Sequence, residues 1–134
     1  MTQEEYVTFE TARLLKEKGF NTEFFFFYRE DDTEKVIHHA NVLRPLIYCD
    51  KIDNEVVNAP TQQMAMRWLR EVHNIFISIN VGFYGENMER LWDNQIYRIQ
   101  NKIENLGQSD SCNTFLSYEE AVDAALYYVL ENLI

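Results

Sequence analysis

The sequence is short of the residues on which many familiar sites depend. Among 134 residues there are two cysteines, four glycines and two prolines. Two cysteines without a CxxC pair make neither a disulfide framework nor a cysteine-rich metal site. Four scattered glycines form neither a phosphate-binding loop nor a dinucleotide-binding fingerprint. We therefore expect a reduced protein without disulfides and without these nucleotide-binding motifs.

Positive charge is also scarce. The chain has 22 acidic residues against 12 Lys and Arg, a formal net charge of −10. After Lys102 there is no Lys or Arg, whereas six acids remain: Glu104, Asp110, Glu119, Glu120, Asp123 and Glu131. Because Lys and Arg neutralise the phosphates of nucleic acids, direct nucleic-acid binding is disfavoured. The acidity serves solubility, or it lets the chain mimic a nucleic acid and occupy a basic partner.

Long apolar runs are missing too. The longest uncharged stretch, residues 72–85, is interrupted by a histidine, two asparagines and a serine, and a membrane span needs about 20 apolar residues. The first residues carry acids where a signal peptide has a basic start and an apolar run. The sequence therefore predicts a cytoplasmic protein that does not enter a membrane.

Capping residues and apolar spacing predict a first helix over residues 8–18. Thr8 can cap its start, and Gly19 stands where a left-handed residue ends a helix. An earlier start at Thr2, with Glu5 completing a capping box, is an alternative. One side of the helix is apolar: Phe9, Ala12 and Leu15.

Two further helices are expected. Residues 61–73 follow a possible Thr61 cap, and their predicted buried stripe is Ala65, Trp68, Leu69 and Val72. The last helix begins after Ser117, which forms a capping box with Glu120. Its apolar stripe is wide: Ala121, Val122, Ala125, Leu126, Val129, Leu130 and Leu133.

Four strands are expected, at residues 22–28, 43–49, 75–81 and 91–103. The third alternates, with Ile75, Ile77, Ile79 and Val81 on one face. Residues 29–41 and 105–116 read as loops, and residues 82–88 as a hairpin turn. The predicted fold is α+β, in the order α-β-β-α-β-β-α. About four antiparallel strands form a sheet that three helices cover on one face, in a single domain over residues 1–134.

The histidines and cysteines offer little chemistry. His38 and His39 are adjacent, so in a strand they point in different directions and bind one metal ion poorly. A nucleophilic Cys49 with His73 as its base is conceivable, but no oxyanion-loop or glycine-elbow motif accompanies it. We therefore expect no metal, no cofactor and no catalytic residue, and we retain an enzyme of unknown reaction as an alternative.

Aromatic residues make up 14% of the chain, and five of them stand in a row at residues 24–28. In a strand, Phe25 and Phe27 point to the face opposite to their neighbours. If Phe25, Phe27, Trp92 and Tyr97 share the uncovered face of one sheet, they form an apolar patch of the kind that marks an interface. Burial in the core is the equally weighted alternative.

Three segments resemble a group of small hypothetical proteins from bacterial genomes, prophages and other mobile elements. They span residues 9–21, 59–79 and 117–134, and the motifs within them are Thr61-Gln62-Gln63, Trp68-Leu69-Arg70-Glu71 and Ser117-Tyr118-Glu119-Glu120-Ala121. In that group a T-Q-rich cap, a W-L-R-E helix and a terminal S-Y-E-E-A helix recur in this order. The resemblance implies a bacterial or phage origin. It implies no activity, because the matching residues are caps and buried stripes and the group has no assigned catalytic residues.

Together these features predict a non-enzymatic accessory protein that works through protein contacts. The unexplained aromatic residues motivate this hypothesis, and we expect a homodimer, with a further protein partner as a possibility. An acidic mimic of nucleic acid that inhibits a basic bacterial enzyme is the main alternative.

Overall fold

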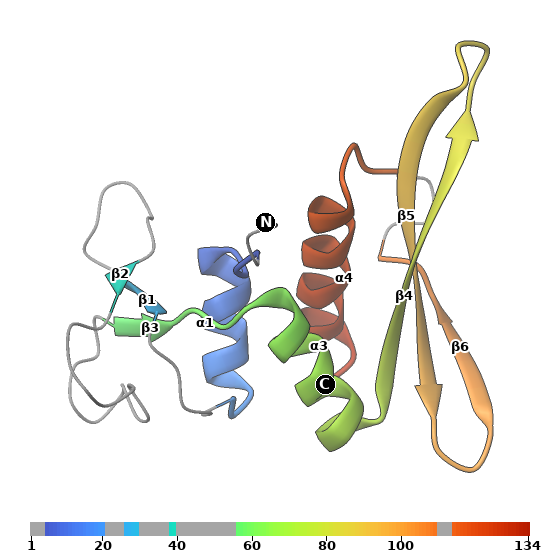
Figure 1. Ribbon diagram of the computed structural model, residues 1–134. Coiled ribbons are helices and arrows are strands. Elements are labelled where there is room, and N and C mark those ends of the chain that lie inside the picture. The colour runs from blue at the N-terminus through green and yellow to red at the C-terminus, as the bar shows by residue number, and fades with distance from the viewer. Residues whose placement is uncertain (1–4, 21–25, 30–37, 40–55, 110–113) are drawn as a thin grey trace. The chain divides into compact units, whose positions relative to one another are not determined.

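The computed structural model describes residues 5–20, 26–29, 38–39, 56–109 and 114–134. The chain divides into two compact units, Met1–Thr61 and Gln62–Ile134, which we describe separately. Helices and antiparallel strands occur in both, so the predicted α+β class is confirmed (Figure 1). The expectation of a single domain stays a prediction.

The first helix, α1 (Phe9–Glu17), begins where its cap predicts. The side chain of Thr8 accepts a hydrogen bond from the backbone N–H of Thr11 at 3.4 Å, which satisfies one of the free donors of the first turn. Tyr6, two residues earlier, forms a β-bridge with Thr61 instead of a helical turn. The alternative start at Thr2 is therefore wrong.

The end of α1 is a Schellman motif. Gly19 has a φ of +95°, a conformation that other residues adopt at a cost. Its N–H bonds to the carbonyl of Lys16 at 3.2 Å, and the N–H of Phe20 bonds to that of Leu15 at 2.9 Å. These two bonds satisfy carbonyls that would otherwise have no partner at the helix end.

The sheet of the first unit has three strands in the order β2-β1-β3, all antiparallel. They are β1 (Phe26–Arg29), β2 (His38–His39) and β3 (Val56–Asn58). The sequence predicts a loop over residues 29–41, but β1 ends at Arg29 and β2 lies within this segment. The phenol of Tyr28 donates to the carbonyl of Val7 at 2.6 Å. The strand expected at residues 43–49 lies outside the described residues.

The second unit has the order α3 (Gln62–His73), β4 (Ile75–Tyr84), β5 (Glu89–Ile99), β6 (Ile103–Gly107) and α4 (Tyr118–Asn132). Its strands form an antiparallel sheet in the order β4-β5-β6. Helix α3 contacts β4 and α4, and α4 also contacts β4 and β5. Both helices lie on the same face of the sheet (Figure 1).

The two helices test the predicted stripes. In α4 the Ser117 side chain accepts from the N–H of Glu120 at 3.1 Å, and all but the last member of the stripe are fully buried, as expected. In α3 the buried stripe is instead Gln62, Ala65, Met66 and Leu69. Trp68 is half-buried and Val72 is 56% exposed, because the buried side is rotated about the helix axis by roughly 60° from the predicted one.

The strand boundaries differ in detail from the prediction. The long strand expected at residues 91–103 ends at Ile99, and the chain turns at 100–102 to form β6, which runs into the segment expected to be a loop from residue 105. Strand β4 continues to Tyr84, so the turn is limited to residues 85–88. The strands thus form two sheets of three instead of one of about four.

Candidate protein-binding surface

The pairing of β4 with β5 determines which side chains face the helices. Ile77 stands opposite Ile96, and Val81 opposite Trp92. Directly opposed residues share a face, so the odd-numbered residues of β4 and the even-numbered ones of β5 point the same way. This is the helix side, because the side chain of Asn94 reaches the carbonyl of Ala121 in α4 at 3.1 Å.

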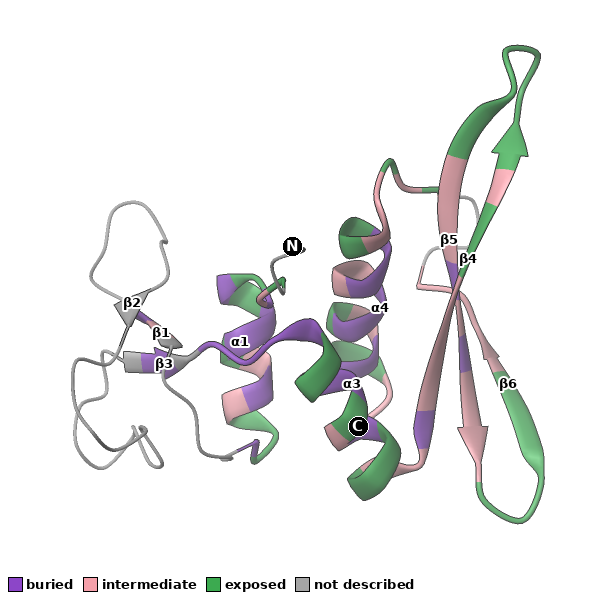
Figure 2. Ribbon diagram, viewed as in Figure 1, coloured by how far each residue is buried: buried purple, intermediate pink, exposed green. Residues whose placement is uncertain are grey.

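The other face of this sheet, here called the outer face, has no helix on it within the described part of the unit (Figure 1). None of its residues is buried, whereas purple, buried positions occur on the helix side (Figure 2). By register, the outer face consists of Phe76, Ser78, Asn80, Gly82, Tyr84, Glu89, Leu91, Asp93, Gln95, Tyr97, Ile99, Ile103 and Asn105.

The outer face has an apolar end and a polar centre. Phe76 stands opposite Tyr97, and Ile99 stands opposite Ile103, which gives four apolar or aromatic side chains near the β5–β6 turn. The centre carries amides and a hydroxyl, among which Gln95 donates to the Oδ1 of Asn105 at 2.5 Å. A surface of this kind offers both apolar contact area and hydrogen-bonding groups.

The only charged side chains of the outer face are acidic, Glu89 and Asp93. The phenol of Tyr84 donates to Oδ2 of Asp93 at 3.1 Å. This hydrogen bond, with the negative charge of Asp93, raises the pKa of Tyr84 above its usual value of 10.

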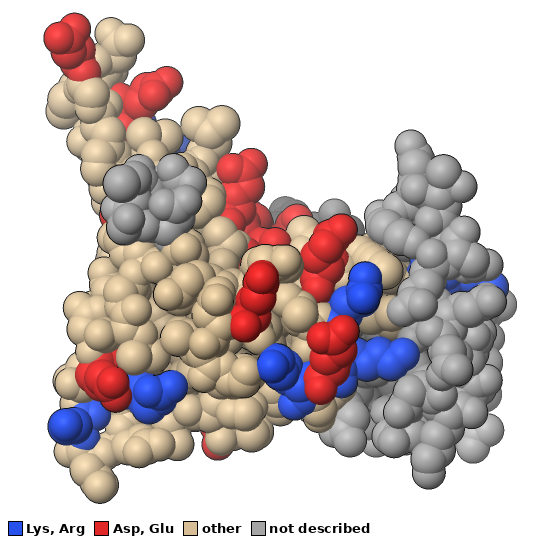
Figure 3. Space-filling view, turned by 180° about the vertical axis from the view of Figure 1, so that it is seen from behind, with Lys and Arg blue, Asp and Glu red and all other residues tan. Residues whose placement is uncertain are grey.

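Strands β4 and β5 extend beyond the helices as a hairpin arm, residues 81–91 (Figures 1 and 2). Val81 is 51% exposed, Phe83 66% and Met88 63%. The turn also carries Glu86, and red acidic side chains appear at the tip of the arm at the upper left of Figure 3. The arm is therefore a largely apolar projection whose charged residues are Glu86, Glu89 and Arg90.

The described members of the four aromatic residues singled out in the sequence do not share one face of one sheet. Tyr97 lies on the outer face, but Trp92, five residues earlier on the same strand, points to the helix side. There its ring meets that of Tyr118 edge-on, with centroids 5.6 Å apart. Phe27 belongs to β1 of the other sheet, and Phe25 lies outside the described residues. Their role in partner binding stays a prediction.

The outer-face residues that sequence reasoning missed could have been found by alternation. Trp92 and Tyr97 are separated by an odd number of positions and must point in opposite directions in a regular strand. The same count places Asp93 and Gln95 with Tyr97.

His73 packs against Trp68 at the end of α3. Its ring meets that of Trp68 edge-on at 4.8 Å, and its Nε2 is buried with no hydrogen-bond partner in the structure. Cys49 lies outside the described residues, and so do the side chains of His38 and His39. In the described part of the chain, no group of three His, Cys, Asp or Glu residues could hold a metal ion.

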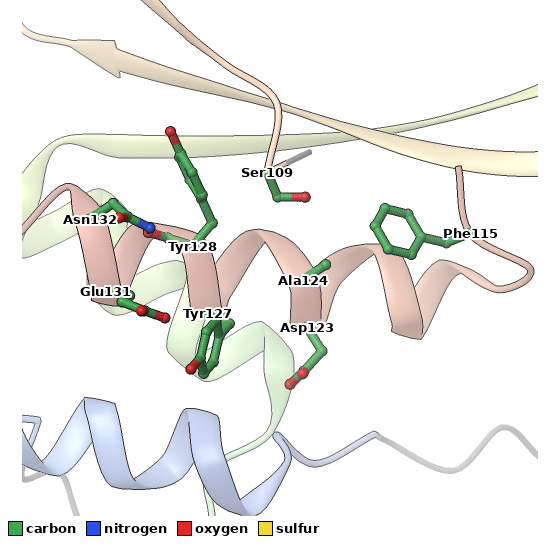
Figure 4. Close-up of a pocket in the computed structure, with 8 residues that line it drawn as sticks. All are labelled: Ser109, Phe115, Asp123, Ala124, Tyr127, Tyr128, Glu131 and Asn132. Atoms are coloured by element: carbon green, nitrogen blue, oxygen red, sulfur yellow. The ribbon is translucent and has the colours of Figure 1, made fainter. Parts of the chain in front are cut away.

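A shallow pocket of about 430 Å³ lies along one side of α4. Its lining combines aromatic rings with carboxylates and contains no Lys or Arg, so it suits neutral or positively charged groups better than anions. Figure 4 shows the side chains projecting from successive turns of the helix, with Ser109 and Phe115 on the opposite wall. The lining residues are Ser109, Phe115, Asp123, Ala124, Tyr127, Tyr128, Glu131 and Asn132.

No family profile, no curated protein and no solved structure matches the chain. In the described part of the chain, no helix has the length and apolar character needed to cross a membrane. What the outer face can bind therefore follows from its own chemistry.

Proposed function

We propose that the chain is a non-enzymatic binding protein that holds a protein partner on the outer face of the β4-β5-β6 sheet. One observation carries this proposal. The two helices of the unit cover one face of the sheet, while none of the residues on the opposite face is buried. Sheets with one solvated face usually carry polar residues there, but this face includes Phe76, Tyr97, Ile99 and Ile103.

The composition of the outer face supports a protein ligand. Interface centres are enriched in aromatic residues and depleted of Lys, and binding loops of antibodies rely on Tyr, Ser and Asn for the same reason. The outer face has Phe76, Tyr84 and Tyr97 together with Ser, Asn and Gln, and it has no Lys or Arg. We expect Phe76 and Tyr97 to act as anchors, because they form an opposed pair.

The charge of the outer face indicates the kind of partner. Glu89 and Asp93 are its only ionisable residues apart from the tyrosines. A partner with a basic or neutral surface would meet no like charge there, whereas an acidic surface would be repelled.

The test compares two tyrosine variants. Tyr97→Ala removes an anchor from the outer face, and Tyr127→Ala removes an exposed tyrosine from α4 as a control. Tagged wild type and both variants are used to capture partners from the native cell, with retained proteins quantified by mass spectrometry. We expect Tyr97→Ala alone to lose the partner while its circular dichroism stays unchanged. If a folded Tyr97→Ala variant captured as much partner as the wild type, the proposal would be wrong.

Mimicry of nucleic acid is a second candidate, favoured by the charge of α4. This helix exposes Glu119, Glu120 and Glu131 and contains no Lys or Arg. Binding through such carboxylates would weaken strongly in about 0.5 M salt, where exposed charges are screened. Binding through the outer face would be much less sensitive to salt, so a salt titration of the captured complex separates the two candidates.

A further inference from the structure

Strand β4 has one edge with no partner in the described part of the chain. It pairs with β5 along its full length, and β5 then pairs with β6. The sequence of β4, IFISINVGFY, contains no charged residue and no proline over its 10 residues. Natural proteins protect exposed sheet edges with charges, prolines, bulges or short strands, and β4 has none of these.

The opposite edge of the same sheet is protected. Strand β6 has only 5 residues, includes exposed Glu104 and is interrupted by a register shift against Ile96 and Tyr97. Beyond β6, Phe115 exchanges backbone hydrogen bonds of 2.7 and 2.8 Å with Trp92. The contrast indicates that the bare edge of β4 is a specific feature of this unit.

The hydrogen-bond pattern shows which backbone groups point out of the open edge. The N–H of Ile99 bonds to the carbonyl of Asn74, and the backbone groups of Trp92 bond to Phe115 on the side away from β4. In an antiparallel pair these bonds alternate, so the even residues of β4 bond to β5. The N–H and C=O groups of the odd residues, such as Ile79 and Val81, therefore point to the open edge.

The side chains of the same odd residues favour a second copy of the chain as the occupant. On β5 the helix-side residues Asn94 and Ile96 are 1% and 0% exposed. Ile77 and Ile79 on β4 also point to the helix side but remain half-buried, and Val81 is exposed. A second β4 strand, with its own helices, would place an identical apolar stripe beside this one. An antiparallel pairing of two identical strands also satisfies the two-fold symmetry of a homodimer.

The absence of charge on β4 also favours a second copy of the chain as the occupant. A chain with a net charge of −10 repels a copy of itself over most of its surface. Strand β4 brings no charge to the contact, so two copies can meet there without opposing like charges on the paired strands.

We propose that two copies of the chain join through the open edges of their β4 strands, antiparallel, into one continuous sheet. The outer faces of both copies then form a single extended surface on one side of that sheet. This inference concerns an edge of the sheet and a second copy of the chain, whereas the proposed function concerns the outer face and another protein, and neither depends on the other.

The test uses substitutions at Val81, whose side chain is exposed and whose N–H points to the open edge. Val81→Lys adds a charge to the edge, and Val81→Pro removes an edge donor without removing a bond to β5. Ile103→Lys is the matched control, because Ile103 is an exposed β-branched residue on the protected edge. Sedimentation equilibrium of the full chain gives the molecular mass over a wide range of concentration.

We expect a dimeric wild type, a dimeric Ile103→Lys variant, and a dimer dissociation constant at least about tenfold higher in both Val81 variants. Circular dichroism identifies any variant that fails to fold, and the other Val81 variant then decides the result. A monomeric wild type would overturn the proposal, including the case in which a foreign strand occupies the edge. Dimerisation of folded Val81→Lys at the wild-type constant would also overturn it. The Tyr97→Ala variant should remain dimeric, which separates a failure here from a failure of partner binding.

Discussion

The side-chain amide of Asn94 on β5 donates a hydrogen bond to the carbonyl oxygen of Ala121 in α4, at 3.1 Å. The same Nδ2 reaches the hydroxyl of Ser109 at 2.7 Å, and Oδ1 accepts from the N–H of Ser109 at 2.8 Å. Asn94 is 1% exposed. One buried side chain therefore holds together the sheet, the segment that follows β6 and the first turns of the last helix.

Replacing Asn94 with alanine should be costly. The substitution leaves the N–H of Ser109 without its side-chain acceptor and the carbonyl of Ala121 without its side-chain donor, in a buried setting. We expect the free energy of unfolding to fall by about 2–3 kcal/mol, measured by urea denaturation followed by far-UV circular dichroism. Asn101→Ala, at an exposed position of the β5–β6 turn, should change it by less than about 0.5 kcal/mol. Equal effects of the two substitutions would contradict this role of Asn94.

The orientation of α3 can be tested with two aliphatic residues. Leu69 is fully buried, and Val72 is 56% exposed. Leu69→Ala should lower the free energy of unfolding by about 2–5 kcal/mol because it leaves a cavity, and Val72→Ala by less than about 0.5 kcal/mol. Thermal unfolding of both variants checks the difference. A large loss of unfolding free energy in Val72→Ala would instead indicate that the stripe predicted from the sequence is the buried one.

Gly19 ends α1 with a φ of +95°, and a Cβ placed there would meet nothing within 4 Å. The cost of Gly19→Ala is therefore conformational and should be about 1–2 kcal/mol. Gly19→Asn should cost less, because asparagine tolerates the left-handed region better than alanine. Urea denaturation of the two variants measures this order, and a cheaper Gly19→Ala would argue against the Schellman motif.

The Tyr84–Asp93 hydrogen bond on the outer face predicts a pH dependence. The bond and the charge of Asp93 raise the pKa of Tyr84 above 10, so the folded state favours the protonated phenol. The stabilisation is fully present below the pKa of an unfolded tyrosine and is lost as the pH rises through the higher folded value. Asp93→Asn should move the pKa of Tyr84 back toward 10, as followed by NMR of the ring carbons. Asp123→Asn on α4 is the control that should leave the pKa unchanged.

The parts of the fold that could be predicted from the sequence depend on local signals. The caps at Thr8 and Ser117, the glycine at the end of α1 and the apolar stripe of α4 each act within a few residues. The alternation that sets Ile75, Ile77 and Ile79 on one face is equally local. These features were expected and are present.

The remaining features depend on non-local pairing. Strand β6 has the sequence IENLG, in which only two residues are apolar, and it becomes a strand because β5 supplies its hydrogen bonds. Which side of α3 is buried also depends on what the helix packs against. Leu69 belongs to both the expected and the observed stripe, but Met66 belongs only to the observed one. The division after Thr61 has no linker to mark it, only Pro60 just before the helix.

Both tryptophans of the chain, Trp68 and Trp92, belong to the second compact unit. Selectively excited tryptophan emission therefore reports on residues 62–134 alone, while the ellipticity of the whole chain includes both units. Emission and ellipticity curves that coincide would mean that the two units unfold as one cooperative body, and curves that separate would give each unit its own stability. The placement of these two indoles gives the protein a built-in optical probe of one half.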